Sequence, residues 1–154
     1  MMMSLSCDVL KALAGKTLVT AESCTGGGIG AALTAVPGSS RVYKGGIISY
    51  TNWVKNRILG VPEELLERFG AVSEPVAKAM AEGVRRELQA DVAVSVTGLA
   101  GPDGDDRGTP VGTVFIGYCD GKITSVEKFC FTGDREQVQR GAISAALNII
   151  LKNN

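Results

Sequence analysis

The sequence of 154 residues contains no histidine. Histidine is the usual general base of hydrolytic triads and the commonest metal ligand in proteins. Its absence excludes a Ser-His-Asp triad and leaves only carboxylates and thiolates for a metal site. Any acid–base catalysis must therefore use lysine, tyrosine, aspartate, glutamate or cysteine.

Long apolar runs, paired cysteines and an excess of one charge are also missing. No apolar run is long enough to span a bilayer, and Met1 to Leu13 lacks the features of a signal peptide. The four cysteines form no CxxC pair, which argues against a zinc site or a disulfide framework. Lysine plus arginine number 16, as do aspartate plus glutamate, so the net charge does not predict a nucleic-acid or membrane-surface partner. We therefore expect a cytoplasmic protein without a nucleic-acid or membrane partner.

The length and the hydrophobic pattern predict one α/β domain over residues 1–154. The patterns predict strands at 17–22, 42–50, 92–97, 111–119 and 123–131. Helices are expected at 8–14, 25–35, 51–59, 62–70, 73–88 and from 134 to the end. Thr51, Ser73 and Asp134 are the predicted N-caps, and Gln137 completes a capping box with Asp134. The Gly45-Gly46 pair predicts a bulge or a close backbone approach in the second strand, and Val76, Met80, Val84 and Leu88 predict one buried stripe on the helix at 73–88. Strands separated by helices should be parallel, whereas the hairpin signal at 120–122 makes one strand antiparallel. We expect a three-layer α/β/α fold around a mixed five-stranded sheet, with one strand antiparallel.

The stretch from Val19 to Gly28 is predicted to end a strand and to open a helix through a glycine-rich turn. Ser23, Cys24 and Thr25 lie at this junction, where open α/β sheets usually bind ligands. The first free N–H groups of the helix would favour negative charge there. A purely structural interpretation is that Ser23 or Thr25 caps the helix and the glycines make a tight turn.

Two further motifs match their templates poorly. The segment from Gly26 to Ala31 follows a dinucleotide-binding fingerprint, but no carboxylate ends the second predicted strand to hold a ribose. The aspartates at 103, 105 and 106 suggest a calcium loop, yet Arg107 and Val114 occupy positions that require oxygen ligands. We therefore expect a solvated loop there, no metal and no cofactor.

A series of motifs, in order along the chain, resembles one family. The motifs are Ala21–Gly27 (AESCTGG), Pro37–Ser40 (PGSS), Gly45-Gly46, Tyr50–Asn52 (YTN) with Lys55, Leu59–Val61 (LGV), Gly70–Ser73 (GAVS), Thr97–Pro102 (TGLAGP), Pro110–Gly112 (PVG) and Gly133–Arg135 (GDR). They resemble the C-terminal domain of the competence/damage-inducible protein CinA, including its stand-alone form, nicotinamide-nucleotide amidohydrolase. The resemblance extends from Gly15 to the C-terminus.

This resemblance implies a three-layer α/β/α fold and hydrolysis of the carboxamide of nicotinamide mononucleotide, which releases ammonia. It also implies a serine nucleophile assisted by lysine and tyrosine, which correspond to Ser23, Lys55 and Tyr50. We expect a homo-oligomer that binds a small nucleotide. The expected substrate-binding residues are Cys24, Thr25, Gly26, Gly27, Asn52, Thr97, Gly98, Ala100, Gly101 and Thr109.

The loop before the Pro-Val-Gly motif departs from the family pattern. Thr109 stands where the family often has a basic residue, with Arg107 two residues earlier, and Asp105 interrupts a Gly-Gly pair. These departures affect the substrate-side contacts of the loop. The serine, lysine and tyrosine are all present.

The chemistry leaves several alternatives open. Lys55 can act as base only if burial or a nearby cation lowers its pKa to roughly 7–8. Alternatively, Lys55 stays charged and Tyr50 carries the proton. The N–H groups from Cys24 to Gly27 suit either the oxyanion of the reaction or a substrate phosphate.

The nucleophile and the class of function are further choices. Cys24 is intrinsically more reactive than a serine, but the resemblance favours Ser23. A non-catalytic nucleotide-binding or regulatory module is the second hypothesis. A nucleotide pyrophosphatase is the third, and it would need a larger domain that a chain of this length does not include.

Overall fold

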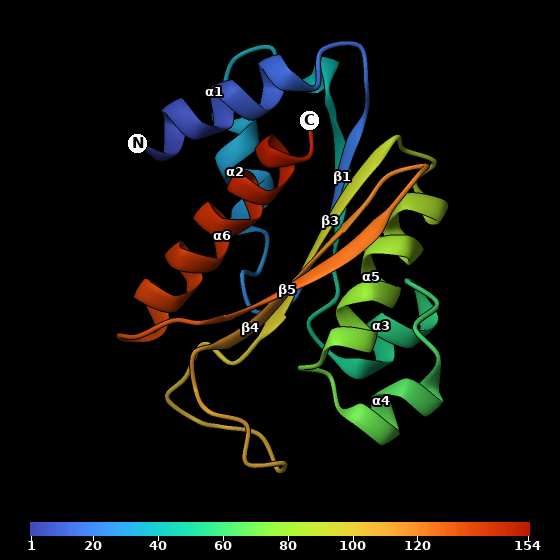
Figure 1. The fold of residues 1–154 in the computed structure, drawn as a ribbon, viewed down its shortest axis with the longest axis vertical. Helices are drawn as coiled ribbons and strands as arrows, with labels where there is room; N and C mark the ends of the chain where they lie inside the picture. The colour runs from blue at the N-terminus through green and yellow to red at the C-terminus, as the bar shows by residue number, and fades with distance from the viewer.

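Five strands form a mixed sheet at the centre of the computed structural model, which describes residues 1–154 (Figure 1). The strands are β1 (Leu18–Glu22), β2 (Tyr43–Ile48), β3 (Val92–Gly98), β4 (Thr113–Cys119) and β5 (Thr124–Cys130). Their order across the sheet is β2-β1-β3-β4-β5. β1 pairs in parallel with β2 and β3, whereas β4 is antiparallel to β3 and β5. The predicted mixed sheet with one antiparallel strand is confirmed.

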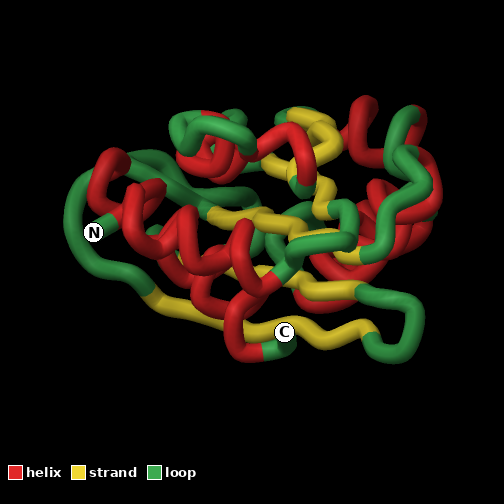
Figure 2. The backbone as a smooth tube through the Cα atoms, turned by 90° about the horizontal axis from the view of Figure 1, so that it is seen from above, coloured by secondary structure: helices red, strands yellow, loops and turns green.

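Helices cover both faces of the sheet. They are α1 (Met2–Ala12), α2 (Gly28–Thr34), α3 (Asn52–Arg57), α4 (Glu63–Phe69), α5 (Glu74–Glu87) and α6 (Arg135–Lys152), and a short 3-10 helix spans Ser39–Arg41. α1, α2 and α6 contact one another on one face, while α5 packs on the other face beside α4. Figure 2 shows the strands between these two helical layers. No helix combines the length and the apolar character that a membrane crossing requires.

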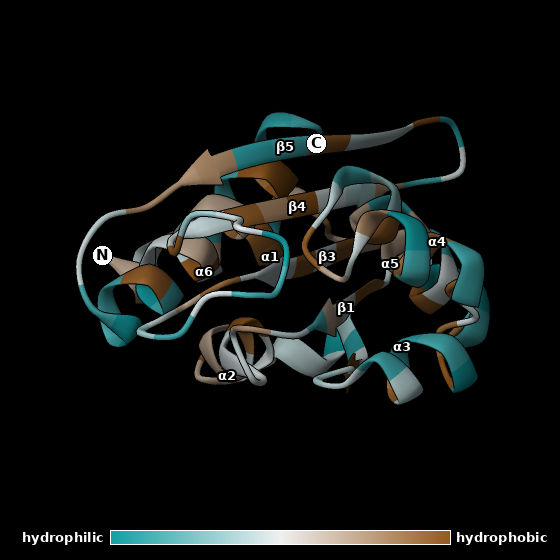
Figure 3. Cartoon of the chain, turned by 90° about the horizontal axis from the view of Figure 1, so that it is seen from below, coloured by the Kyte–Doolittle hydropathy of each residue, from teal (hydrophilic) through white to brown (hydrophobic).

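Each face of the sheet has its own hydrophobic core. Of the predicted apolar stripe, Val76, Met80 and Val84 on α5 are fully buried, and Leu88 at the end of the helix is partly buried. The central strand β3 is buried along almost its whole length, as its continuous apolar sequence predicts. In Figure 3, hydrophobic segments coloured brown lie on β3 and β4, and hydrophilic segments coloured teal lie on α3 and α4.

Helix α1 begins earlier than the sequence suggested. It starts at Met2 rather than at Asp8, and its C-cap is Leu13. Leu5 and Val9 lie one turn apart and pack against the core that α1 shares with α2 and α6. This tertiary packing extends the helix past Asp8, although no side chain caps its start.

Helix α2 begins later than predicted, at Gly28 instead of Thr25. Gly26 and Gly27 have φ angles of 58° and 101°, which lie in the left-handed region. The Gly26 N–H donates to the Ser23 carbonyl, so these residues form a turn before the helix. Neither Ser23 nor Thr25 is therefore the N-cap, and Gly27 takes that position.

The other predicted caps have mixed outcomes. Asp134 and Gln137 form the predicted capping box at the start of α6. The Thr51 side chain accepts the N–H of the third residue of α3, as expected. Ser73 precedes α5 but does not cap it, because its hydroxyl donates to the Gly70 carbonyl.

The edge strand β2 lies very close to β1. A side chain at Gly46 would collide with the Thr20 hydroxyl, so only glycine fits there. A register shift opposite Leu18 and Val19 marks a bulge in the pairing. The bulge or close approach predicted from the Gly-Gly pair is confirmed.

A loop of residues 99–112 connects β3 to β4 at the lower end of Figure 1. Its two ends are fastened together, because Leu99 N–H donates to the Thr113 carbonyl and Gly112 N–H donates to the Leu99 carbonyl. Gly112 has a φ of 95°, and a side chain there would meet the Phe131 backbone. The loop therefore leaves and rejoins the sheet at one fixed point.

Candidate active site

A cavity of about 460 Å³ opens where β1 and β3 end and the 99–112 loop begins. This volume lies within the range of about 300–1,000 Å³ that is typical of small-molecule sites. The predicted site residues that line it are Ser23, Cys24, Tyr50, Asn52, Lys55, Thr97, Gly98, Ala100 and Gly101. The residues predicted to bind substrate that do not line it are Thr25, Gly26, Gly27 and Thr109.

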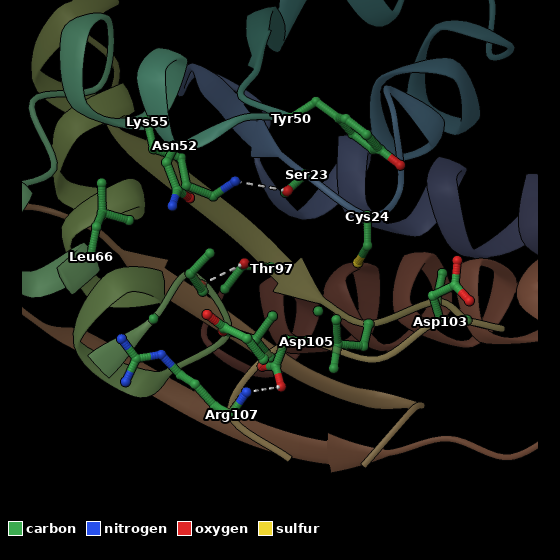
Figure 4. A pocket seen from close by; sticks show the side chains of 18 of the residues that line it. Ser23, Cys24, Tyr50, Asn52, Lys55, Leu66, Thr97, Asp103, Asp105 and Arg107 are labelled. Carbon is green, nitrogen blue, oxygen red and sulfur yellow. Dashed lines mark hydrogen bonds between the residues drawn. The ribbon is translucent and has the colours of Figure 1, made fainter. Parts of the chain in front are cut away.

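Ser23 and Lys55 are in direct contact (Figure 4). Ser23 directly follows the last residue of β1, and its N–H donates to the Val96 carbonyl of β3. Lys55 lies on α3 and is 2% exposed, and Ser23 is 7% exposed. The lysine Nζ donates to Ser23 Oγ over 2.9 Å and to the Ser49 carbonyl over 2.6 Å. The hydroxyl and the amine are therefore held together out of solvent.

Burial lowers the pKa of Lys55 from 10.5 to about 8. No carboxylate forms a salt bridge with it, so the cost of desolvating the charged amine is not offset by an ion pair. With this pKa, roughly one amine in ten is neutral at pH 7. The lysine can thus accept a proton at physiological pH.

The Cys24 thiol points into the same cavity (Figure 4), but its pKa is shifted in the opposite direction to that of Lys55. Burial raises the pKa of this thiol to about 11. The thiolate, which is the nucleophilic form, is therefore scarce at neutral pH. This difference favours Ser23 over Cys24 as the nucleophile.

Tyr50 lines the cavity, but its hydroxyl is not part of the Ser23–Lys55 contact. The side chain is 56% exposed. Its hydroxyl points away from Lys55 (Figure 4) and accepts a hydrogen bond of 2.8 Å from Arg135 Nη2. The structure therefore brings together two of the three residues expected to carry out the reaction.

Glu22, the last residue of β1, is a buried carboxylate that sequence reasoning did not single out. It is 2% exposed, and both its oxygens accept two hydrogen bonds. The donors are the hydroxyls of Thr20 and Thr25 and the N–H groups of Ile29 and Gly30. The only signal in the sequence was an acidic residue directly before the serine at a strand end.

This carboxylate corrects one expectation about the site. The N–H groups of Ile29 and Gly30, in the first turn of α2, are already occupied by Glu22. The start of the helix is thus neutralised by the protein's own anion. It is not a free binding site for an anionic substrate group.

Two arginines that were not predicted as site residues also line the cavity. Arg135, at the start of α6, donates to the Gly101 carbonyl over 2.7 Å. Its positive charge lowers the pKa of the Cys24 thiol and so partly opposes the effect of burial. Arg107, in the loop, donates to the Arg68 and Glu67 carbonyls at the end of α4. Arg135 was visible in the sequence as part of a motif, without an assigned role.

The aspartates of the loop organise the loop itself. Asp105 Oδ1 accepts the backbone N–H groups of Arg107 and Thr109, each over 3.0 Å. Hydrogen bonds from Thr109 hold the pKa of Asp105 below its usual value. No three carboxylates or thiols of the chain gather closely enough to hold a metal ion.

Comparisons with known proteins agree with this architecture. A model of the CinA C-terminal domain matches residues 3–153. A CinA-like protein of Parasynechococcus marenigrum is 52% identical over 136 residues, which cover 87% of this chain and 32% of that protein. The chain spans about a third of the length of the curated relatives it matches.

Solved structures resemble the chain over nearly its full length. The competence damage-inducible protein A of Klebsiella pneumoniae has a TM-score of 0.96 at 37% identity, covering 98% of this chain and 95% of that one. A CinA superfamily protein of Escherichia coli has a TM-score of 0.97 at 36% identity, covering 100% and 91%. The chain therefore belongs to the family of the CinA C-terminal domain.

Proposed function

We propose that this chain is a Ser-Lys amidohydrolase that converts nicotinamide mononucleotide to nicotinate mononucleotide and ammonia. The observation that carries the proposal is the 2.9 Å hydrogen bond between the Lys55 amine and Ser23 Oγ in a buried position. A serine hydroxyl needs a base to become nucleophilic, and a lysine with a pKa of about 8 supplies one. The choice of substrate rests on the resemblance to nicotinamide-nucleotide amidohydrolases.

In the proposed first step, neutral Lys55 takes the proton of Ser23 as Oγ attacks the carboxamide carbon. The resulting tetrahedral intermediate expels ammonia when Lys55 returns the proton to the leaving nitrogen. This leaves an ester between Ser23 and the nicotinate group. Water, deprotonated by Lys55, then attacks the ester carbon. Lys55 returns this proton to Ser23 Oγ as its bond to that carbon breaks, which releases nicotinate mononucleotide and restores both side chains.

The negative oxygen of the tetrahedral intermediate needs hydrogen-bond donors. Cys24 lines the cavity next to the nucleophile, and its backbone N–H has no acceptor in another residue. We assign the oxyanion to the Cys24 amide, because Glu22 already occupies the N–H groups of Ile29 and Gly30 in α2.

The substrate phosphate needs a cation other than Lys55, which is committed to the reaction. Arg135 fits this role because it lines the cavity and uses only two of its five N–H donors, in hydrogen bonds to Gly101 and Tyr50. The other donors can bind the phosphate. Arg107 is less suitable, since its guanidinium caps the end of α4. We therefore place the phosphate at Arg135.

The test is to incubate the purified chain with nicotinamide mononucleotide and to measure ammonia and nicotinate mononucleotide. Ser23→Ala should lower kcat by at least about a thousandfold, because no other group can form the ester. Cys24→Ala is the matched control and should stay within about tenfold of wild type, because its thiol is protonated. The reverse pattern would refute Ser23 as nucleophile. Binding of the nucleotide without any ammonia would favour a regulatory module instead.

A further inference from the structure

We propose that Glu22 is a positioning residue that fixes both members of the Ser23–Lys55 pair, one through its side chain and the other through its backbone. The proposal rests on the proposed function, because it assigns Glu22 a role in the same reaction. Glu22 itself is turned away from the cavity, which it does not line. It acts through the groups that it holds.

The side chain of Glu22 holds the turn that presents Ser23. Oε1 accepts from the Thr25 hydroxyl over 2.7 Å and from Ile29 N–H over 2.8 Å, and Oε2 accepts from Gly30 N–H over 2.9 Å. These bonds connect the end of β1 to α2 across the Ser23–Gly27 turn. No other side chain caps α2, so this carboxylate is what fastens the turn to the helix.

The backbone of Glu22 holds the segment that carries Lys55. Its carbonyl accepts the Ser49 N–H over 2.7 Å and the Ser49 hydroxyl over 3.2 Å. The Ser49 carbonyl in turn accepts the Lys55 amine over 2.6 Å. One residue therefore connects β1, α2 and the chain leading into α3, and it does so next to the nucleophile.

The charge and the two accepting oxygens of Glu22 both matter for this role. Its four donors require acceptors on both oxygens, whereas the amide group of glutamine accepts at only one end. A glutamine would therefore leave donors unpaired in a buried place, at the start of a helix that favours an anion. Since Glu22 makes no contact with the Lys55 amine, it should set the geometry of the pair rather than the pKa of the base.

The test compares Glu22→Gln with Asp91→Asn. Asp91 is a matched control at the opposite end of β1, where its carboxylate accepts the N–H and the hydroxyl of Thr17 far from the cavity. Two readouts are measured over a pH range: turnover of nicotinamide mononucleotide, and labelling of Ser23 by a fluorophosphonate followed by intact mass. Circular dichroism and thermal unfolding give the folded fraction of each variant.

We expect Glu22→Gln to lower kcat and the labelling rate by about a hundredfold, because small misplacements of reacting groups have effects of that size. KM should stay within about threefold, and the midpoint of the pH profile should remain near 8. Asp91→Asn should change the unfolding temperature but neither rate. Labelling of folded Glu22→Gln at the wild-type rate would overturn the proposal, as would a shifted midpoint with an unchanged plateau.

Thr25→Val covers the case in which Glu22→Gln does not fold. It removes one donor to Glu22 and should slow both rates by about three- to tenfold. No change in either rate would refute the role of Glu22.

The two proposals can fail separately. Wild-type protein that is labelled at Ser23 but releases no ammonia would refute the proposed function, and the labelling rates of the variants would still test the role of Glu22. If Glu22→Gln turns over nicotinamide mononucleotide as fast as the wild type, only the role proposed for Glu22 is refuted. If wild type shows neither labelling nor turnover, both proposals fail.

Discussion

The two walls of the cavity are built in different ways. One wall, here called the strand-end wall, consists of Ser23, Cys24 and Lys55, all buried. The opposite wall, the loop wall, comes from the 99–112 loop and includes Asp103, Asp106 and Arg107, all exposed. The strand-end wall is held by β1, β3 and α3, whereas the loop wall is held by hydrogen bonds within the loop and to α4.

This difference indicates that the two walls have different roles. Groups that exchange protons need fixed distances and a controlled dielectric, which buried residues on regular elements provide. Groups that select a ligand work on an exposed loop, where their side chains can change without disturbing the sheet. Substitutions on the strand-end wall should therefore affect kcat, and substitutions around the rest of the cavity should affect KM.

After Ser23→Ala, the largest effect is expected at Lys55. Lys55→Arg keeps a permanent positive charge and Lys55→Met has none, so neither variant can accept the Ser23 proton. Both should lower kcat/KM for nicotinamide mononucleotide by at least about a hundredfold. Steady-state kinetics with ammonia detection measures this. Activity of Lys55→Met within about tenfold of wild type would remove lysine from the mechanism.

The same variant tests the burial of the amine. A pKa lowered from 10.5 to about 8 means that the charged amine costs about 3 kcal/mol of folding stability below pH 8. The cost declines as pH rises from 8 to 10.5, because the unfolded chain then binds more protons than the folded one. Lys55→Met should therefore be about 2 kcal/mol more stable at pH 7, after allowing for the lost bond to Ser49. Urea unfolding at pH 7 and pH 10 measures the difference.

The pH dependence of the proposed activity of the wild-type protein should show the next largest effect. Since the base must be neutral, kcat/KM should rise about tenfold from pH 6 to pH 7 and level off above about 8. A profile of initial rates in buffers of constant ionic strength provides the measurement. An activity that is flat between pH 6 and pH 9 would contradict a lysine base.

A smaller effect, on KM, is expected from the two arginines. Arg135→Gln should raise KM by about tenfold, because a hydrogen bond to a charged group contributes more than a neutral one. Arg107→Gln is its counterpart on the loop wall and should raise KM by less than about threefold, because that guanidinium binds α4. Equal effects, or an effect mainly on kcat, would show that the phosphate lies elsewhere.

The smallest effect should follow from Tyr50→Phe. The phenol hydroxyl is bonded to Arg135 and not to Ser23 or Lys55, so its loss should reduce kcat/KM by about threefold or less. The measurement also decides between the two bases considered for the reaction. A complete loss of turnover would identify Tyr50 as the proton carrier.

The sequence predicted the features that depend on local patterns. The alternation of strands and helices gave the three layers, and the capping box at Asp134 marked the start of α6. The start of α1 was missed because it depends on packing against α6 and not on a cap. The helical start of α2 was misplaced because the two glycines suit a turn as well as a first helical turn.

The site was predictable only in part, for similar reasons. Ser23 and Lys55 were identified through the family resemblance, but their contact depends on how β2 leads into α3. The role of Glu22 was not visible, since its partners at Ile29 and Gly30 are reached only when the chain folds back after the turn. The direction of the Tyr50 hydroxyl depends on Arg135, which is 85 residues away in the sequence.

The fastened ends of the 99–112 loop have a consequence for how such proteins diversify. Because Leu99, Gly112 and Thr113 close the loop with backbone hydrogen bonds, its interior can gain or lose residues while the sheet keeps its register. The entropic cost of lengthening a loop grows only slowly with its length. Segments between Gly101 and Pro110 should therefore tolerate exchange, and transplanting one from another member of the family would test whether this loop selects the substrate of the proposed reaction.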